Sequence, residues 1–223
     1  MFLLKVFSVI KQRPTYILQY ARGTFLFIFT KVLQSFLLDC QKVRLHKSVR
    51  SQNIQNFLAG SELARIIVDA HAVVYENARV EVYDAGVVHI GESTILGDVR
   101  IACRQKISIG KRVLSSWNVF IQDYDPHPTS QELRGIQTEM MAANFFPRYG
   151  KKPEVRPLDW KPMCEEIFIG DDVWLGANCV ILKGSRIGAG SIVAVGAVVS
   201  GGDFPERSLI AGNPAKFIRE LPR

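Results

Sequence analysis

The sequence predicts a parallel β-solenoid, in which short strands stack along an axis as successive coils. Two observations support this fold class. An aliphatic residue recurs at every sixth position from Ile169 to Val199, and a small residue follows several of these positions. A period of six matches neither an α-helical face, which repeats at about 3.6 residues, nor a single strand, which repeats at about two. It matches a coil with flat sides, in which three sides make a turn of about 18 residues.

The six-residue spacing defines the extent of the predicted solenoid. The strongest run is Ile169, Leu175, Ile181, Ile187, Val193 and Val199; weaker runs are Val68, Val74 and Val80, then Ile90 and Leu96, then Ile109 and Ile121. Shifts of register between these groups predict short loops. Each aliphatic side chain is expected to point inward, and each small residue to allow the chain to turn a corner. Strict hexads make the alternative, an ordinary β-sandwich, the weaker interpretation.

The chain is predicted to have three parts. Residues 1–60 are expected to be helical, with Pro14 limiting the first helix, and residues 61–203 to form the β-helix. Residues 204–223 are expected to form a cap that ends in a short basic helix. The hexads stop over residues 124–166, which are rich in proline, charge and aromatic residues, so this segment is predicted to be a long functional loop.

Charge is concentrated at the N-terminus. Residues 1–50 hold nine Lys or Arg residues and one acid, Asp39, whereas the whole chain has a net charge of +7. This segment is also apolar and aromatic, which suits peripheral binding to an anionic membrane; packing on the solenoid or a trimer contact is the alternative. Arg22 and Lys31 interrupt its apolar run, so a spanning helix is not expected. We expect a cytoplasmic protein, peripheral at the inner face of the membrane if the segment binds lipid.

Two segments resemble a known family. Ile169-Gly-Asp-Asp-Val-Trp-Leu-Gly-Ala177 with the hexads after it, and Ile210-Ala-Gly-Asn-Pro-Ala-Lys216, resemble the hexapeptide-repeat acyltransferases, and among them the sugar O-acetyltransferases. The resemblance covers about residues 65–221. It implies a left-handed β-helix, acetyl-CoA as the acyl donor and a homotrimer with the donor bound between subunits.

The predicted loop begins with the residues Asp123-Tyr-Asp125-Pro-His127-Pro128. The resemblance implies that His127 is the catalytic base. A sugar hydroxyl must lose its proton as it attacks a thioester, and a neutral imidazole can accept that proton. Prolines on both sides would stiffen the backbone around the ring. Asp123 or Asp125 could bond the other ring nitrogen and fix its tautomer. The oxyanion donor is expected to be Asn118 or a backbone N–H group at a coil corner.

The resemblance also implies positions for the acetyl-CoA site. Contacts to the donor fall on Ala177, Val195 and Ser200, with Trp174 lining the groove. The phosphates need cations, and the matching positions are Lys216 and Arg219. Where related enzymes often carry a lysine after the position of Ser200, this chain has Gly201, and Lys183 could substitute for that lysine.

The acceptor site is predicted within the long loop. Arg148, Tyr149 and Trp160, with Phe145 and Phe146, could stack on a sugar or hold a phosphate, although they could also pack on one another. The basic N-terminus favours O-acetylation in polysaccharide biosynthesis, on a cell-surface polysaccharide or its precursor. N-acetylation of a nucleotide-linked amino sugar is the alternative.

Other functions fit the sequence less well. A γ-class carbonic anhydrase would need a zinc site from His71, His89 and His127; the first two are 18 residues apart and could stack on one face, but no metal is expected because the ligand spacing is wrong. A non-enzymatic scaffold would need neither the His-Pro motif nor the basic tail. No nucleic-acid-binding motif occurs, and the β-helix itself is almost neutral. Cys40, Cys103, Cys164 and Cys179 form no CxxC pair and are expected to be reduced.

Overall fold

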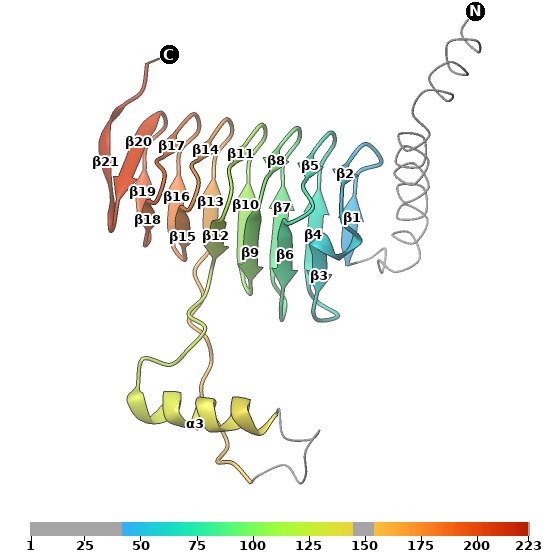
Figure 1. Cartoon of the computed structure of the whole chain (residues 1–223), viewed down its shortest axis with the longest axis vertical. Coiled ribbons are helices and arrows are strands. Elements are labelled where there is room, and N and C mark those ends of the chain that lie inside the picture. Colours follow the sequence, from blue (N-terminus) through green and yellow to red (C-terminus); the bar gives the residue numbers. More distant parts are fainter. Residues whose placement is uncertain (1–41, 145–153, 223) are drawn as a thin grey trace, which may run out of the picture.

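The computed structural model of the chain describes residues 42–144 and 154–222. These residues form a parallel β-solenoid from which one helical excursion projects (Figure 1). The strands lie in three sheets, and successive coils contribute one short strand to each sheet. The predicted fold class is therefore confirmed. The left-handed sense of the coil is implied by the family resemblance.

The three sheets run the length of the solenoid. Sheet A contains β1 (Val43–Leu45), β4 (Arg65–Val68), β7 (Val87–Ile90), β10 (Lys106–Ile109), β13 (Ile167–Ile169), β16 (Ser185–Ile187) and β19 (Gly202–Phe204). Sheet B contains β2 (Arg50–Ser51), β5 (Val73–Val74), β8 (Ile95–Leu96), β11 (Leu114–Ser115), β14 (Trp174–Leu175), β17 (Ile192–Val193), β20 (Ser208–Gly212) and β21 (Ala215–Glu220). Sheet C contains β3 (Phe57–Ala59), β6 (Arg79–Val82), β9 (Val99–Cys103), β12 (Val119–Gln122), β15 (Val180–Leu182) and β18 (Val198–Val199).

The core is a set of aliphatic ladders inside the coil. In sheet C, Ile121 pairs with Ile101 on one side and with Ile181 on the other, and Ile181 pairs with Val199; none of these four side chains is accessible to solvent. Every residue of the predicted hexad runs is buried. Each buried aliphatic side chain contributes about 1.5–3 kcal/mol relative to exposure, so the repeat holds the coils together.

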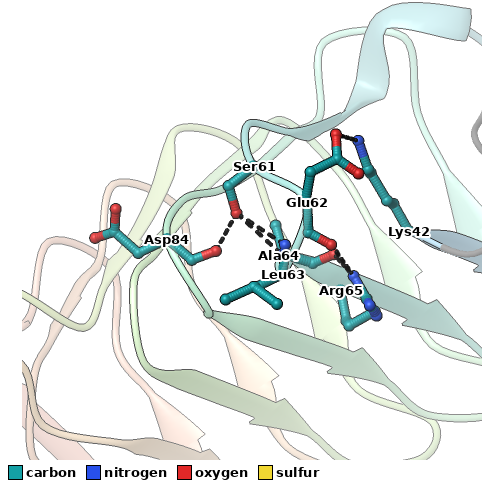
Figure 2. A network of polar contacts seen from close by, with 7 residues as sticks. All are labelled: Lys42, Ser61, Glu62, Leu63, Ala64, Arg65 and Asp84. Atoms are coloured by element: carbon teal, nitrogen blue, oxygen red, sulfur yellow. Dashed lines mark hydrogen bonds and ion pairs between the residues drawn. The ribbon is translucent and has the colours of Figure 1, made fainter.

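Small residues and polar contacts close the corners. A Cβ atom on Gly170 would lie 2.6 Å from the backbone nitrogen of Ala189 on the next coil, so only glycine fits there. Figure 2 shows the turn between β3 and β4, where Ser61 accepts hydrogen bonds from the N–H groups of Leu63 and Ala64 and donates to the carbonyl of Asp84. These bonds satisfy backbone groups that the sheets leave unpaired.

Two expectations about the ends of the solenoid are wrong. Residues 43–59, expected to be helical, form β1, β2, the 3₁₀ turn η1 (Ile54–Asn56) and β3, so the coil begins before residue 61. The basic helix expected at the C-terminus is instead a β-hairpin of β20 and β21, which extends sheet B. Gly212, with a φ of 102°, and the cis Asn213–Pro214 peptide make its turn. Pairing with β20 gives the backbone of residues 215–220 hydrogen-bond partners along the strand, whereas a short isolated helix would be only marginally stable.

The expected long loop does leave the coil between β12 and β13 (Figure 1). It contains the helix α3 (Gln131–Ala143), which begins at Ser130, whose side chain accepts from the N–H of Leu133. Residues 1–41 lie outside the described residues, and so does the predicted membrane segment apart from residues 42–50. In the described part, no helix has the length and apolar character needed to cross a membrane.

Candidate active site

His127 lies exposed at the start of the excursion, between sheet C and helix α3. Its Nδ1 atom is 2.8 Å from Oε1 of Gln137, which is on α3. Among the described residues, the other ring nitrogen, Nε2, has no hydrogen-bond partner. The ring is thus held at one nitrogen and open to an incoming group at the other, as a general base requires.

Asp123 does not fill the role of partner to His127. Its carboxylate is buried and accepts hydrogen bonds from the backbone N–H groups of Arg104, Gln105 and Lys106, at 2.8–2.9 Å, and from the Cys103 thiol at 3.1 Å. Burial and the nearby Asp123 carboxylate raise the pKa of that thiol, so it stays protonated. Asp123 is therefore an anchor at the base of the excursion, where a charged acceptor satisfies three backbone donors.

Asp125 pairs with Lys183 and not with His127. It lies 3.5 Å from Nζ of Lys183, which bonds Glu165 at 3.0 Å. The hydrogen bond to Glu165 raises the pKa of Lys183. These residues line a cavity of about 570 Å³ that also includes Ser200 and Gly201. Because Lys183 already faces two carboxylates, it is a poor substitute for the missing phosphate-binding lysine.

The outward face of sheet B carries an apolar ladder that sequence analysis did not identify. Six residues in register on adjacent strands form it: Val73, Ile95, Leu114, Trp174, Ile192 and Leu209. Trp174 is half-exposed, and its Nε1 donates to Ser116 at 3.2 Å. The corresponding row on sheet A is mixed and includes Arg44, His89, Arg186 and Asp203. The outward face of sheet B thus differs chemically from that of sheet A.

The predicted phosphate ligands lie at the end of this ladder. On β21, Arg219 is opposite Leu209, and Lys216 is opposite Ala211. Residues three apart on a regular strand would point to opposite faces, but the register shifts between these two pairs. Directly opposed residues share a face, so the irregularity at Ile218 places both cations on the outward side with Leu209. Trp174, Lys216 and Arg219 therefore share one face although the predicted helix is absent.

The other predicted donor contacts are divided between two edges of sheet C. Trp117, Ala177 and Val195 occupy equivalent corner positions, because the N–H of Asn178 bonds the Trp117 carbonyl and that of Gly196 bonds the Ala177 carbonyl. Asn118 is at the same corner, exposed and with a φ of 55°. Ser200 lies at the opposite edge, beside the base of the excursion. The fold of the chain therefore places Ser200 at a different edge from Ala177 and Val195.

The predicted acceptor residues are only partly described. Arg148 and Tyr149, with Phe145 and Phe146, lie outside the described residues, and Trp160 is half-buried in the returning arm of the excursion. Sequence analysis missed a cavity of about 480 Å³ beside the corner of sheets B and C, lined by Gln52, Tyr75, Asn77, Asp98, Leu114 and Trp117 among others. An exposed indole beside amides and a carboxylate is the chemistry that sugars require.

The three histidines considered for zinc lie apart. His89 pairs in sheet A with Ile67 and Ser108, not with His71, because these coils are offset by 22 residues rather than 18; the expectation that the two stack is wrong. His89 bonds Asp69 at 2.9 Å, the His71 ring lies 6.5 Å from that of His46, and His127 bonds Gln137. Within the described residues, no group of three or more His, Cys, Asp or Glu residues could hold a metal ion.

The fold and the site define a hexapeptide-type parallel β-solenoid with a histidine on a projecting loop. Comparison with known proteins relates this arrangement to a family. Residues 166–201 match the family model "Bacterial transferase hexapeptide (six repeats)". The chain thus carries the hexapeptide repeat of bacterial transferases, as the resemblance predicted. It is 32% identical over 143 residues, 64% of this chain, to a putative lipopolysaccharide biosynthesis O-acetyl transferase, WbbJ, of Escherichia coli. The match spans 65% of that relative, just under two thirds of its length.

Two further similarities concern a short segment of the sequence and the fold, respectively. A 59-residue segment, 26% of this chain and 24% of the relative, is 49% identical to a 2,3,4,5-tetrahydropyridine-2,6-dicarboxylate N-acetyltransferase of Staphylococcus aureus. Among solved structures, the polySia specific acetyltransferase NeuO superposes with a TM-score of 0.50 at 20% identity, covering 77% of this chain and 59% of that one. The structural likeness agrees with the fold described above.

The Asp123 anchor leads to a stability prediction. Replacing Asp123 by Asn should lower the free energy of unfolding by about 3 kcal/mol, because an amide cannot accept from all the buried donors that the carboxylate satisfies. Urea unfolding followed by circular dichroism measures the change. The matched variant Asp125→Asn, which loses only a partly exposed ion pair, should change it by less than about 1 kcal/mol. Wild-type stability with a lowered kcat for Asp123→Asn would restore the catalytic role.

Proposed function

We propose that the chain is an acetyl-CoA-dependent O-acetyltransferase that modifies a sugar of a cell-surface polysaccharide or its precursor. The observation that carries the proposal is the exposed imidazole of His127, bonded at Nδ1 and open at Nε2, on a hexapeptide solenoid. The similarity to a putative lipopolysaccharide O-acetyl transferase supports the choice of reaction and acceptor class.

In the proposed reaction, Nε2 of His127 accepts the proton of a sugar hydroxyl while its oxygen attacks the thioester carbonyl carbon of acetyl-CoA. Hydrogen-bond donors stabilise the negative charge on the carbonyl oxygen. The C–S bond then breaks, and the proton held by His127 passes to the departing thiolate. The products are the acetyl ester and CoA, and the imidazole returns to its neutral form.

The outward face of sheet B suits the donor. An extended, mostly apolar pantetheine arm would lie along Trp174, Ile192 and Leu209, and the phosphates would meet Arg219 and Lys216 at the end of the ladder. The cavity beside Trp117 suits the sugar acceptor. Since His127 lines neither cavity, we propose that the excursion of one subunit brings His127 to sheet B of its neighbour.

N-acetylation of an amino sugar is the second candidate. The similarity to an N-acetyltransferase over 59 residues favours it. That segment is short, and a hexapeptide coil can be shared by enzymes with different acceptors. An amine is a better nucleophile than a hydroxyl and needs less help from a base, so the dependence on His127 separates the two reactions.

The reaction can be tested with labelled acetyl-CoA and a panel of sugars and amino sugars. His127→Ala should lower kcat/KM for a hydroxyl acceptor by about 10²–10⁴-fold, because the base is lost. His89→Ala is the matched control, since this half-exposed histidine lies on sheet A and its ring bonds Asp69. Wild-type turnover by His127→Ala, or ester formation by neither protein, would refute the proposal.

The donor site gives a second prediction. Replacing Lys216 and Arg219 together by Ala should raise KM for acetyl-CoA about tenfold or more with little change in kcat, because charge-assisted bonds to phosphate are lost. Acetyl-dephospho-CoA, which lacks the 3′-phosphate, should show a smaller difference between wild type and variant. The control is Lys111 and Arg186 replaced together by Ala, on other parts of the surface. An equal effect in both double variants would exclude a specific phosphate site.

Subunit contact through sheet B gives a third prediction. We propose a homotrimer in which part of the apolar ladder is covered by a second copy. Leu114→Asp should weaken the assembly, since a charge on a buried apolar contact is costly, whereas Ser108→Asp on the outward face of sheet A should not. Sedimentation velocity measures both. A wild-type chain that sediments as a monomer while it transfers acetyl groups would contradict the proposed assembly.

A further inference from the structure

Helix α3 holds the segment around His127 at the carbonyl groups on both sides of the ring. Nε2 of Gln137 donates to the carbonyl of Pro126 at 3.3 Å. One turn earlier on the same helix, Nη1 of Arg134 donates to the carbonyls of Pro128 and Thr129 at 2.9 and 2.8 Å. Residues three apart on a helix share a face, so one face of α3 contacts the whole turn.

The same Gln137 side chain also contacts the imidazole of His127, and this second bond determines which ring nitrogen carries the hydrogen. A carbonyl oxygen can only accept, so the end of the amide that faces Pro126 is the NH₂ group. The other end is therefore the oxygen, which lies 2.8 Å from Nδ1 of His127 and must itself accept. Nδ1 consequently carries the hydrogen, and neutral His127 has its lone pair on Nε2.

We infer that Gln137 is a positioning residue that sets the tautomer and the orientation of His127. The inference rests on the proposed function and assigns to Gln137 the role that Asp123 or Asp125 was expected to play. When Nε2 takes a proton, the Nδ1–H bond to Gln137 is retained, so the interaction serves both forms of the base. A neutral amide fixes the tautomer without placing a negative charge beside the ring.

The composition of the turn explains why a helix is needed for this task. Pro126 and Pro128 have no backbone N–H group, so the turn has two fewer donors with which to hold itself. Its carbonyls bond instead to side chains from α3. Pro128 on the turn and Ile136 on α3 are both buried. The excursion thus supplies a framework for a single imidazole.

The tautomer can be measured without any assay of activity. Long-range ¹H–¹⁵N correlation spectra of the full chain labelled with ¹⁵N-histidine distinguish protonated from unprotonated ring nitrogens, and His127→Ala identifies the signals of His127 among those of four histidines. We expect the neutral ring to be protonated at Nδ1 and unprotonated at Nε2. In Gln137→Leu, the spectrum should show a mixture of both tautomers. A wild-type ring protonated at Nε2 alone would overturn the inference, whether or not the chain transfers acetyl groups.

Kinetics supply the second readout. Gln137→Leu should lower kcat on the order of tenfold, a part of what the base contributes, and leave KM for acetyl-CoA within about twofold. The matched control is Gln131→Leu, the same change on the same helix at an exposed side chain without a hydrogen bond in the described part of the chain. Gln137→Glu can still accept from Nδ1 and should recover most of kcat.

The outcomes separate this inference from the proposed function. Loss of turnover in His127→Ala with equal turnover in Gln137→Leu and Gln131→Leu would overturn the role of Gln137 and leave the base intact. A kcat for Gln137→Glu as low as that for Gln137→Leu would also count against it. Circular dichroism spectra that match the wild type establish that α3 is retained, so that a lowered kcat is attributed to the ring.

Discussion

The stacking of aliphatic side chains inside the coil is the interaction on which the rest of the structure depends. Each short strand bonds only to the coils before and after it, so no single strand would be stable alone. The inward ladders, such as Ile101, Ile121, Ile181 and Val199, hold all three sheets in register. A shift by one residue would turn the aliphatic row outward, and the hexads therefore specify which side chains are free for chemistry.

The same regularity allows a long excursion at one corner. Residues 123–166 leave after β12, yet Ile107 and Ile167 still pair across the interruption as successive members of sheet A. The two arms are joined at their base, where the N–H of Glu165 bonds the Asp123 carbonyl and that of Asp125 bonds the Met163 carbonyl. Arg104 adds contacts with the Tyr83 and Tyr124 rings. The solenoid can thus accept a long insertion at this corner without a change in the pairing of its coils.

Much of the fold follows from the sequence because a period of six leaves few alternatives. The ends were harder to predict: β1 to β3 lack clear hexads, and the basic residues of β21 fit a helix as well as a strand until pairing with β20 is known. In the site, the His-Pro motif marked His127, but three of the four partners of Asp123 are backbone N–H groups, which no side-chain pattern reveals. Gln137 is ten residues from His127 and lies on a helix that the hexad pattern did not predict, although Leu133, Ile136, Met140 and Ala143 recur there at spacings of three and four residues. Ser130 followed by Glu132 was the available signal for a helix start.

The two parts of the candidate site are built on different physical principles. The face proposed for the acyl donor follows from the register of strand pairing. Trp174, Ile192, Leu209 and Arg219 are aligned because the strands that carry them pair in order. The position of His127, by contrast, depends on side chains that hold a turn in which Pro126 and Pro128 lack N–H groups. Contacts in an exposed excursion are weaker than those in a core, so they can be changed without loss of the fold. Variation in the loop and in α3 can therefore change how His127 is held while the solenoid continues to present the same apolar face of sheet B.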